Sequence, residues 1–524
     1  MNQGITDPLT TSLPLITLFE RQVIRRPEAT AIESGRLTLD YASLNTRAWA
    51  LTHYLQQKGI APGDRVCILS ENDPEFMVLS IAGLRLGFTI ATVNPRLSDS
   101  EIRHCIRLVN PRLVFVSNNQ QHHLEKILSN AEDAPTIDTL VFGNDTELNQ
   151  QLEKTTGKHS DNYPLHDPES IQFIIYTSGT TGLPKAAMIS HRAMLARLMV
   201  YVLDYGIDEE DTFLAWSPLC HMASIELGVG TLLLGGKVAV LDGPDLTVIC
   251  DYLERDKLSN LIFFPGMLEK TIAYLEQRKP IPKGIKKFGA LADLYHPNDI
   301  AKLTKLLNTP FTNTFGSTET GMPPLSAGKL AIGKAPENLA KVPSSLCQIK
   351  LVHETGRDCV AGETGELAMR GPTLFSGYWS DSDATAEVFK NGWYHCGDIF
   401  RLREDGLYDY IDRKRYLIKS GGENIYPAEI ERIFHHHPEV TEAVVVKQQD
   451  PTWGETPVLI VATEAHTLST AHLMEMCEAQ LPRFKLPKNI FVINNDQLPR
   501  SATGKVIRKE LEQWVASQNK NPIN

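Results

Sequence analysis

The sequence lacks the patterns of a membrane protein, a disulfide-stabilised protein and a zinc protein. It contains no run of 18 apolar residues, which argues against a membrane-spanning helix. Its eight cysteines are scattered without a C-x-x-C pair, so neither a zinc knuckle nor a disulfide framework is expected. The N-terminus has no basic segment followed by an apolar one, and the C-terminus carries no Ser-Lys-Leu signal. We therefore expect a soluble, cytoplasmic protein.

An excess of positive charge is also missing. The chain has 52 Lys and Arg against 63 Asp and Glu, a net charge of −11, so a nucleic-acid or anionic-membrane surface is not expected. Its 524 residues are 42% hydrophobic and 22% charged, which is ordinary for a globular protein. A chain of this length is expected to form about two to four domains. The charge balance still permits a local basic patch that binds an anionic cofactor.

Strand and helix patterns alternate through much of the chain. Apolar residues at positions 44, 48, 51 and 55 lie at helical spacing, whereas residues 65–69 and 113–116 form short apolar runs typical of buried strands. Such alternation predicts parallel sheets covered by helices on both faces, an α/β fold. Residues 347–371 instead show an all-β pattern. The polar stretch 412–415 predicts a domain boundary, followed by a small α+β unit.

Phosphate binding is predicted for residues 176–185, YTSGTTGLPK, which follow an apolar, strand-like run. Small residues let backbone N–H groups approach a phosphate, hydroxyls donate hydrogen bonds, and Lys185 neutralises charge. The motif differs from the common P-loop because Leu183 and Pro184 separate Gly182 from the lysine. The alternative is a Ser/Thr/Gly-rich surface loop in which the lysine has no function.

A second segment, residues 313–321 (NTFGSTETG), combines an aromatic ring, hydroxyls and a carboxylate. An aromatic face stacks on adenine, a hydroxyl donates to phosphate, and a carboxylate holds the Mg²⁺ that accompanies ATP. A structural turn would need only the glycine and the serine. The apolar helix predicted over residues 224–234 contains Gly228 and Gly230, which suits the lining of a tunnel or, equally, close packing against a neighbouring strand.

Seven blocks of sequence together resemble the adenylate-forming superfamily, which includes acyl-CoA synthetases, aryl-CoA ligases, luciferases and the adenylation domains of peptide synthetases. The blocks are residues 176–185, 218–221, 315–319, 392–398, 412–413, 419–429 and 498–505. They follow the family's order over roughly residues 15–515, and they look most like those of an acyl-CoA or aryl-CoA ligase.

The resemblance implies both a fold and a reaction. Residues 1–412 would form a large AMP-binding domain of two doubly wound sheets plus a small β-barrel, and residues 413–524 a small mobile α+β domain with a hinge near Arg415. Catalysis would lie between the two domains. A carboxylic acid would attack the α-phosphorus of ATP and expel pyrophosphate. The thiol of coenzyme A would then take the acyl group from the adenylate and release AMP.

The same resemblance implies the site residues. The catalytic residues would be Lys185, His221, Thr318, Glu319, Lys419 and Lys505. The cofactor-binding residues would be Thr177, Ser178, Gly179, Thr180, Thr181, Gly182, Gly289, Ala290, Leu291, Thr314, Phe315, Gly316, Ser317, Asp398, Arg413, Gly421 and Gly422. Lys185 and the phosphate loop would hold the leaving pyrophosphate, Thr318 would contact the α-phosphate, and Glu319 would bind Mg²⁺.

The remaining roles concern the nucleoside and the thiol. Phe315 would stack on adenine, and Asp398 would accept hydrogen bonds from both ribose hydroxyls, with Arg413 reaching the ribose or a phosphate. Lys505 would enter to stabilise the pentavalent phosphorus and then leave. Rotation of the C-terminal domain would bring the glycines at positions 421 and 422 against the pantetheine arm of coenzyme A.

Two further residues have roles only through the resemblance. Lys419 would serve the second step. His221 would gate the acyl tunnel, although a lone histidine is more often a hydrogen-bonded core residue. Three positions depart from the family pattern: Arg415 replaces the usual Asp or Lys of the hinge, Cys396 replaces a Thr, and residues 289–292 lack a second glycine.

The acid is predicted to be a medium aliphatic or aryl acid, because the lining expected for the acyl pocket is apolar and lacks a charged side chain. This lining is Ala223, Ile225, Gly228, Gly230, Leu291, Thr314, Gly321 and Met322. Amino-acid activation is less expected, since Met222 stands where such enzymes place an Asp for the substrate ammonium. Loading of a carrier protein, a non-catalytic nucleotide-binding role and assembly as a homodimer stay open.

Overall fold

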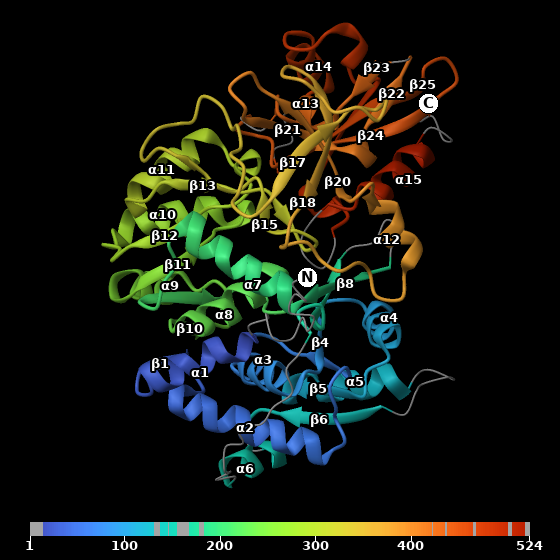
Figure 1. Ribbon diagram of the computed structural model, residues 1–524. Coiled ribbons are helices and arrows are strands. Elements are labelled where there is room, and N and C mark those ends of the chain that lie inside the picture. The colour runs from blue at the N-terminus through green and yellow to red at the C-terminus, as the bar shows by residue number, and fades with distance from the viewer. Residues whose placement is uncertain are drawn as a thin grey trace, which may run out of the picture. The chain divides into compact units, whose positions relative to one another are not determined.

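A computed structural model describes residues 14–129, 137–144, 146–154, 167–177, 183–421, 423–434, 437–464, 468–500 and 506–518. The chain divides into two compact units, whose elements are labelled in Figure 1. Unit 1 comprises Met1–Ile349 and Met369–Tyr394, and unit 2 comprises Lys350–Ala368 and His395–Asn524. No helix within the described ranges is both long and apolar enough to cross a membrane.

Unit 1 contains a six-stranded sheet with the order β6-β5-β3-β4-β7-β8. Its strands are β3 (Arg65–Leu69), β4 (Thr89–Val93), β5 (Leu113–Ser117), β6 (Asp138–Phe142), β7 (Ile171–Thr177) and β8 (Lys185–Ser190). Neighbouring strands are parallel except β8, which runs antiparallel to β7. The connecting helices are α3 (Glu75–Leu86), α4 (Asp99–Val109) and α5 (Asn118–Ser129). The central strands are buried along nearly their whole length, as expected for a sheet with both faces covered.

The second sheet of unit 1 has eight strands in the order β16-β13-β12-β11-β9-β10-β1-β2. These are β1 (Thr30–Ser34), β2 (Thr38–Asp40), β9 (Asp211–Ala215), β10 (Lys237–Val240), β11 (Lys257–Leu261), β12 (Ile285–Phe288), β13 (Phe311–Asn313) and β16 (Gly328–Leu330). The strands from β13 to β1 are parallel, and β2 and β16 are antiparallel edges. The predicted α/β class with two doubly wound sheets is confirmed.

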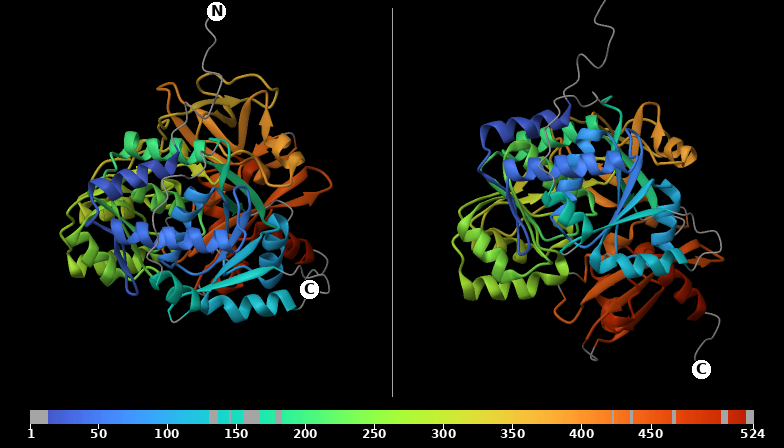
Figure 2. Two further views of the ribbon diagram at one scale, coloured as in Figure 1. Left: turned by 60° about the horizontal axis from the view of Figure 1, so that its bottom comes forward. Right: turned by 90° about the horizontal axis from the view of Figure 1, so that it is seen from below.

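Helices enclose this second sheet. They are α1 (Leu15–Arg25), α2 (Tyr41–Gln57), α7 (His191–Val200), α8 (Met222–Leu234), α9 (Leu246–Arg255), α10 (Leu268–Arg278) and α11 (Pro297–Leu307). α7 continues as a single π-helical turn over Tyr201–Tyr205. Leucines and isoleucines of α9, α10 and α11 share one core with the strands, and α10 and α11 lie side by side in yellow-green in Figure 2.

Unit 2 is centred on a sheet with the order β23-β22-β25-β24, in which β26 also pairs with β25. The elements are β22 (Ile418–Ser420), β23 (Glu423–Ile425), α13 (Pro427–Glu431), β24 (Glu442–Asp450), β25 (Gly454–Ala462), α14 (Thr470–Glu478), β26 (Asn489–Ile493) and α15 (Arg508–Gln518). Side chains alternate between its faces. Val445 and Leu459 join the core under α14, whereas Val444 and Ile460 join the core under α15.

A further sheet contains β17 (Gln348–Val352), β18 (Thr364–Arg370), β19 (Phe389–Lys390), β20 (Trp393–Leu402) and β21 (Tyr408–Arg413). This region contains the all-β stretch expected from residue 347 onward. β20 pairs antiparallel with both β19 and β21. The domain boundary at residue 412 and the hinge near Arg415 stay predictions.

Asn72, which follows β3, ties together the two sheets of unit 1. Its Nδ2 donates to the carbonyl oxygens of Ala215 (2.9 Å), Ser217 (3.0 Å) and Leu241 (3.2 Å), and its Oδ1 accepts from the Leu219 N–H (2.8 Å). Ala215 ends β9 and Leu241 directly follows β10. One side chain therefore fixes the carboxyl end of a strand in one sheet to the carboxyl ends of two strands in the other.

We expect Asn72→Ala to destabilise unit 1 by about 2 kcal/mol or more, because three carbonyls and one N–H lose a partner in a partly buried place. Denaturant unfolding followed by fluorescence would measure this loss. Asn298→Ala, which changes an exposed side chain of α11, is the matched control. A change within about 0.5 kcal/mol for both variants would contradict a structural role for Asn72.

Candidate active site

The carboxyl edge of the eight-stranded sheet collects the residues predicted to bind the nucleoside. Residues 289–291 follow β12, and Thr314 and Phe315 follow β13. Parallel strands end at one edge, which is where open α/β sheets bind ligands. The Thr314 N–H donates to the Ala290 carbonyl oxygen at 2.9 Å, so the two segments are joined directly.

Gly289 is required by the close approach of these segments. Its φ is +122°, and a Cβ atom there would lie 2.8 Å from both the Phe311 ring and the Thr312 carbonyl oxygen. No side chain fits at this position. Residues 289–292 lack the second glycine of the family pattern, but the tightest contact of the segment is at Gly289, which is present.

Thr318 and Glu319 occupy the tip of a hairpin formed by β14 (Gly316–Ser317) and β15 (Gly321–Pro324). A Cβ atom on Gly316 would lie 2.1 Å from the Gly321 carbonyl oxygen, so only glycine allows the two strands to approach this closely. Thr318 and Glu319 are partly exposed. The hairpin therefore presents a hydroxyl and a carboxylate on a rigid backbone.

The residues that flank the hairpin tip are fixed by short-range hydrogen bonds. The backbone N–H of Phe315 donates to Ser326 Oγ at 2.9 Å, and the ring of Phe315 is half-buried. The backbone N–H of Ser317 donates to Thr320 Oγ1, also at 2.9 Å. The residues predicted to bind adenine and phosphate thus belong to one stretch of chain that is held by hydrogen bonds.

Residues 375–379 bring the hairpin and the lysine of the phosphate loop together. This segment runs beside β8: the Trp379 N–H donates to the Ala186 carbonyl and the Met188 N–H to the Gly377 carbonyl. At its other end the Phe375 N–H donates to the Glu319 carbonyl oxygen at 2.8 Å. The segment thus docks on both elements.

Tyr378 lies between Lys185 and Glu319 as a result. Its hydroxyl donates to Glu319 Oε1 at 2.9 Å, and Lys185 Nζ lies 5.1 Å from the centroid of its ring. Burial, together with the charge of Glu319, raises the pKa of the Tyr378 phenol, which therefore remains a donor. Tyr378 was not predicted from the sequence, because a tyrosine within a turn-rich stretch carries no chemical signal of its own.

Some predicted residues lie outside the described part of the chain. These are Ser178, Gly179, Thr180, Thr181, Gly182, Gly422 and Lys505. Thr177 is the last residue of β7 and is the register partner of Lys185 on β8. The phosphate loop therefore lies in the chain between two adjacent antiparallel strands, of which only the first was expected from the sequence.

His221 and the neighbouring helix α8 are also fixed in place. His221 is the N-cap of α8 and is partly exposed. The Thr92 Oγ1 donates to the carbonyl oxygen of Cys220 at 2.9 Å, which anchors the preceding residue to β4. A Cβ atom on Gly228 would lie 3.1 Å from Met77, and one on Gly230 would lie 3.1 Å from Leu198. These glycines serve close packing against neighbouring helices, not an open tunnel.

In unit 2, Asp398 and Arg413 are register partners on β20 and β21. Arg413 Nε lies 3.3 Å from Asp398 Oδ1, and the carboxylate is buried whereas the arginine side chain is exposed. The adjacent Asp412 accepts from the Ala428 N–H at 2.9 Å and so holds the start of α13. The predicted ribose-binding pair is thus an ion pair on a rigid strand pair.

The residues expected to serve the thiol step lie on β22 and the turn after it. The side chain of Lys419 is exposed, and its backbone N–H donates to Glu455. Gly421 has a φ of +59°, and a Cβ atom there would lie 2.6 Å from the Trp453 ring. Only glycine therefore fits beside this tryptophan. Arg415 lies 4.7 Å from the centroid of the Tyr416 ring.

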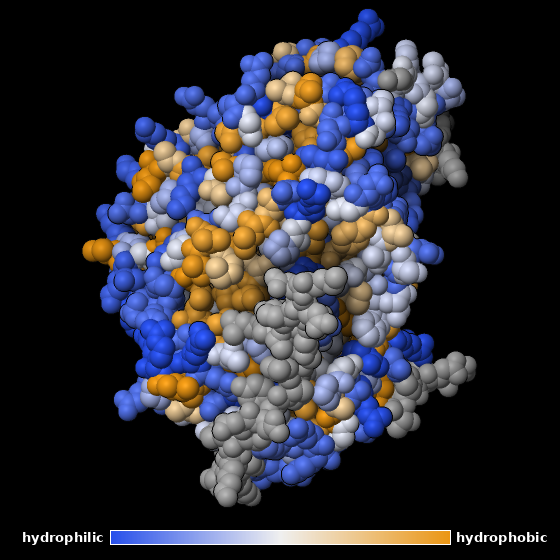
Figure 3. Space-filling view, viewed as in Figure 1, coloured by the Kyte–Doolittle hydropathy of each residue, from blue (hydrophilic) through white to orange (hydrophobic). Residues whose placement is uncertain are grey.

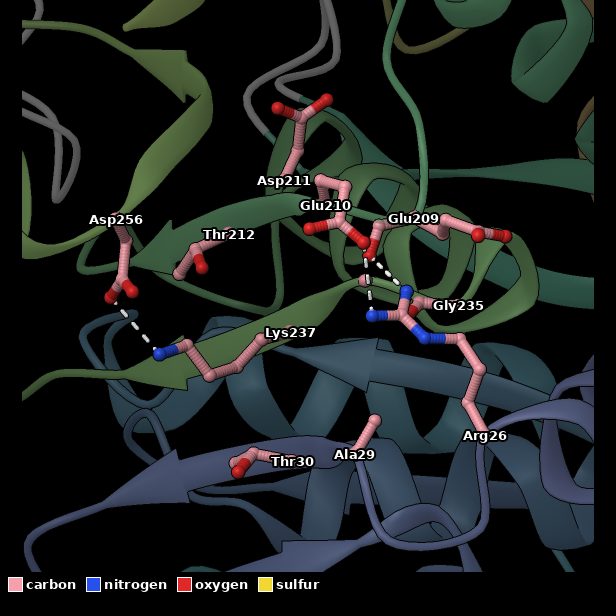
Figure 4. Close-up of a pocket in the computed structure, with 11 residues that line it drawn as sticks. Arg26, Ala29, Thr30, Glu209, Glu210, Asp211, Thr212, Gly235, Lys237 and Asp256 are labelled. Carbon is pink, nitrogen blue, oxygen red and sulfur yellow. Dashed lines mark hydrogen bonds and ion pairs between the residues drawn. The ribbon is translucent and has the colours of Figure 1, made fainter. Parts of the chain in front are cut away.

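A small cavity of about 160 Å³ in unit 1 is a different place from this site (Figure 4). It lies at the amino ends of β1, β9 and β10, opposite the edge where α/β sheets bind ligands. Arg26 donates there to the carbonyl oxygens of Glu209 and Gly235, and Lys237 pairs with Asp256 at 3.0 Å. Both cations therefore have protein partners, and we interpret the cavity as a structural feature that holds the amino ends of these strands together.

Lys287 on β12 is a buried lysine next to the nucleoside segment. Its Nζ donates to Asn260 Oδ1 and to the Gly289 carbonyl oxygen, each at 3.0 Å. Burial lowers its pKa from 10.5 to about 7. The sequence does not single out Lys287, because Lys286 stands beside it in the same strand, Ile285–Phe288.

The pH dependence of stability tests the burial of Lys287. Between about pH 7 and 10.5 the unfolded chain keeps the proton that the folded chain has lost, so the free energy of unfolding rises with pH. We expect this rise to exceed that of Lys287→Met by up to about 1.4 kcal/mol per pH unit. Denaturant unfolding of both proteins from pH 7 to 9.5 would measure it. Parallel pH profiles would contradict the prediction.

Two family models match this chain. The family model described as "AMP-binding enzyme" matches residues 19–379, and that described as "AMP-binding enzyme C-terminal domain" matches residues 429–505. The chain belongs to the AMP-binding enzyme family. The first match includes the phosphate loop, the hairpin that carries Thr318, and Tyr378. The second match includes most of the described residues from α13 to the end of unit 2.

Relatives within the AMP-binding enzyme family cover nearly the whole chain. An indoleacetate–CoA ligase of Aromatoleum aromaticum is 30% identical over 95% of this chain and 97% of its own length. A feruloyl-CoA synthase of an Amycolatopsis species is 28% identical over 94% and 97%. The solved o-succinylbenzoate CoA synthetase of Bacillus subtilis shares the fold, with a TM-score of 0.80, 23% identity and coverage of 94% of this chain and 97% of that one.

Proposed function

We propose that this protein is an AMP-forming acid–CoA ligase, which activates a carboxylic acid as an acyl-adenylate and transfers the acyl group to coenzyme A. The observation that carries the proposal is the 30% identity, over 95% of the chain, to a relative named as a CoA ligase. The cluster of Lys185, Tyr378 and Glu319 supports it. A nucleoside triphosphate with Mg²⁺ needs a cation for its phosphates and a carboxylate for the metal, and both lie beside Tyr378.

The first half-reaction needs positioning and charge neutralisation more than a protein nucleophile, because the acid itself attacks the phosphorus. Lys185 would neutralise the departing pyrophosphate, and Thr318 would donate to the α-phosphate. The carboxylate of Glu319 fits Mg²⁺, since it is partly exposed, is held by Tyr378 and is the kind of oxygen ligand that this ion prefers. When bound, Mg²⁺ would neutralise phosphate charge.

Unit 2 would supply the nucleoside and thiol contacts. Asp398 would accept from the ribose hydroxyls, with Arg413 beside it. Lys505 would stabilise the pentavalent phosphorus, and Lys419 with the glycines at 421 and 422 would serve the thiol step. These roles rest on the family resemblance, and the buried Asp398 carboxylate supports the first of them.

The acid is proposed to be a medium aliphatic or aryl acid. Ile225 and Met322 are buried apolar residues of the expected lining. The two relatives described above are named for indoleacetate and ferulate, both aryl acids. We also propose a cytoplasmic location, which is supported by the fact that none of the eight cysteines forms a disulfide. A carrier protein as the acyl acceptor and a homodimeric state are the alternatives to test.

Mass spectrometry after incubation with ATP, Mg²⁺ and a panel of aliphatic and aryl acids, with and without coenzyme A, tests the function. We expect acyl-CoA to form only when coenzyme A is present, and its mass will identify the acid. Acyl-adenylate without any thioester would favour a carrier protein as acceptor. Formation of neither product with any acid would contradict the proposal.

The Tyr378→Phe variant tests the cluster itself. It removes the hydroxyl that holds Glu319 and keeps the ring beside Lys185, so we expect a roughly tenfold higher Mg²⁺ requirement for adenylate formation. Pyrophosphate release measured against Mg²⁺ concentration would show this shift. Tyr274→Phe, which loses a hydrogen bond to Thr247 on the far helices α9 and α10, is the matched control. An unchanged Mg²⁺ profile in Tyr378→Phe would remove Tyr378 from the site.

A further inference from the structure

Helix α7 buries mostly apolar side chains, yet it also buries a charged one and exposes an apolar one. Met199 and, on the π-helical turn that follows, Leu203 are exposed at 41% and 56%, and apolar side chains gather over this part of unit 1 in Figure 3. The charged Arg197, in contrast, is buried with 1% of its side chain exposed. A surface helix normally buries its apolar face. Departures from this rule in natural proteins are concentrated at functional sites.

The buried guanidinium of Arg197 is bonded in three directions. Nη1 forms an ion pair with Glu226 of α8, whose side chain is also 1% exposed. Nε donates to the Thr373 carbonyl oxygen at 2.8 Å, and Nη2 donates to the Thr318 carbonyl oxygen at 3.1 Å. The planar fork of arginine suits three divergent partners, and a lysine ammonium would not reproduce this geometry.

The arginine side chain also lies directly under the catalytic hairpin. A Cβ atom on Gly321 would come within 2.9 Å of Cγ, Cδ and Nε of Arg197. Arg197 thus touches both ends of the hairpin tip, at the Thr318 carbonyl and at Gly321. Any shift of the guanidinium would be transmitted to the two residues between them, one of which is Glu319.

The second backbone partner of Arg197 leads to the same cluster. Thr373 lies two residues before Phe375, whose N–H donates to the Glu319 carbonyl oxygen. Tyr378, three residues further on, holds the Glu319 side chain. Arg197 therefore fixes the two backbone segments that together determine where the Glu319 carboxylate lies.

Stability alone does not account for such a pair. Replacing a buried ion pair by well-packed apolar residues is often neutral or stabilising, because two charges must be desolvated to form it. Glu226 stands on α8 next to Ile225, a residue of the expected acyl wall. The pair therefore links the helix of the acid site to the hairpin of the nucleotide site.

We propose that Arg197 is a positioning residue, which holds the Thr318–Glu319 backbone against α8 with its charge balanced by Glu226. This inference rests on the proposed ligase function, because it assigns Thr318 and Glu319 to nucleotide and Mg²⁺. It also couples the position of α8, which carries the expected acid-site residue Ile225, to the position of the hairpin. Arg197 itself need not touch either substrate for this role.

The decisive variant is the charge-neutral double substitution Arg197→Met with Glu226→Leu. It removes both buried charges, so we expect its melting temperature to stay near that of the wild type. The hairpin loses its guanidinium donor, and we expect kcat for adenylate formation to fall about 100-fold. Calorimetric binding of a non-hydrolysable ATP analogue with Mg²⁺ should weaken about 10-fold or more.

Two further variants distinguish positioning from folding. Arg197→Lys keeps a cation for Glu226 and lacks the fork, so it should also lose kcat, and it tests the proposal if the double variant does not fold. Arg85→Met removes another fully buried arginine, on α3, that carries no role in the site. It should lower the melting temperature and leave kcat and KM per folded molecule unchanged.

The outcomes separate this inference from the proposed function. A double variant that folds, binds the analogue normally and keeps kcat within about twofold of the wild type would overturn the positioning role. A wild type that makes no adenylate with any acid would overturn the ligase function instead. Even then, the binding of the ATP analogue would still test whether Arg197 positions the hairpin.

Discussion

Backbone hydrogen bonds between residues 375–379 and β8 are the interaction on which the cluster of Lys185, Tyr378 and Glu319 depends. They place Tyr378 beside Lys185, and the bond from the Phe375 N–H to the Glu319 carbonyl brings the hairpin to the same place. Lys185 and Tyr378 are nearly 200 positions apart along the chain. A cation and a carboxylate therefore both lie beside Tyr378 because a short extended segment pairs with the edge of a sheet.

Buried cations secure the loops that the sheet itself cannot hold. Beyond the last residue of a strand the ladder of backbone hydrogen bonds ends, and exposed carbonyls need other donors. Arg197 donates to the Thr318 carbonyl oxygen, and the fully buried Lys341 donates to Asn313 Oδ1 at 2.8 Å. Bonds from charged donors are roughly twice as strong as neutral ones. The desolvation cost of each cation is thus offset where backbone position matters most.

Much of the fold could be predicted from the sequence, since strand and helix periodicities indicated the α/β class. For the candidate site, the glycine-rich and hydroxyl-rich segments after apolar runs predict where ligands bind. The sequence could not reveal Tyr378, Asn72 or Arg197, because their roles come from contacts between distant segments. Gly228 and Gly230 suited a tunnel or close packing equally well, and only the neighbouring side chains of Met77 and Leu198 distinguish the two.

The electrostatics of α8 connect these observations to the choice of acid. An apolar acid needs a wall without net charge, since an unpaired ion beside an apolar ligand would be desolvated without compensation. The expected lining has no charged residue, yet Arg197 packs directly against Gly321 behind it. Glu226 removes the net charge of this guanidinium by direct ion pairing. The pair that aligns the hairpin therefore also keeps the adjoining wall neutral, which is the condition that an aliphatic or aryl acid requires.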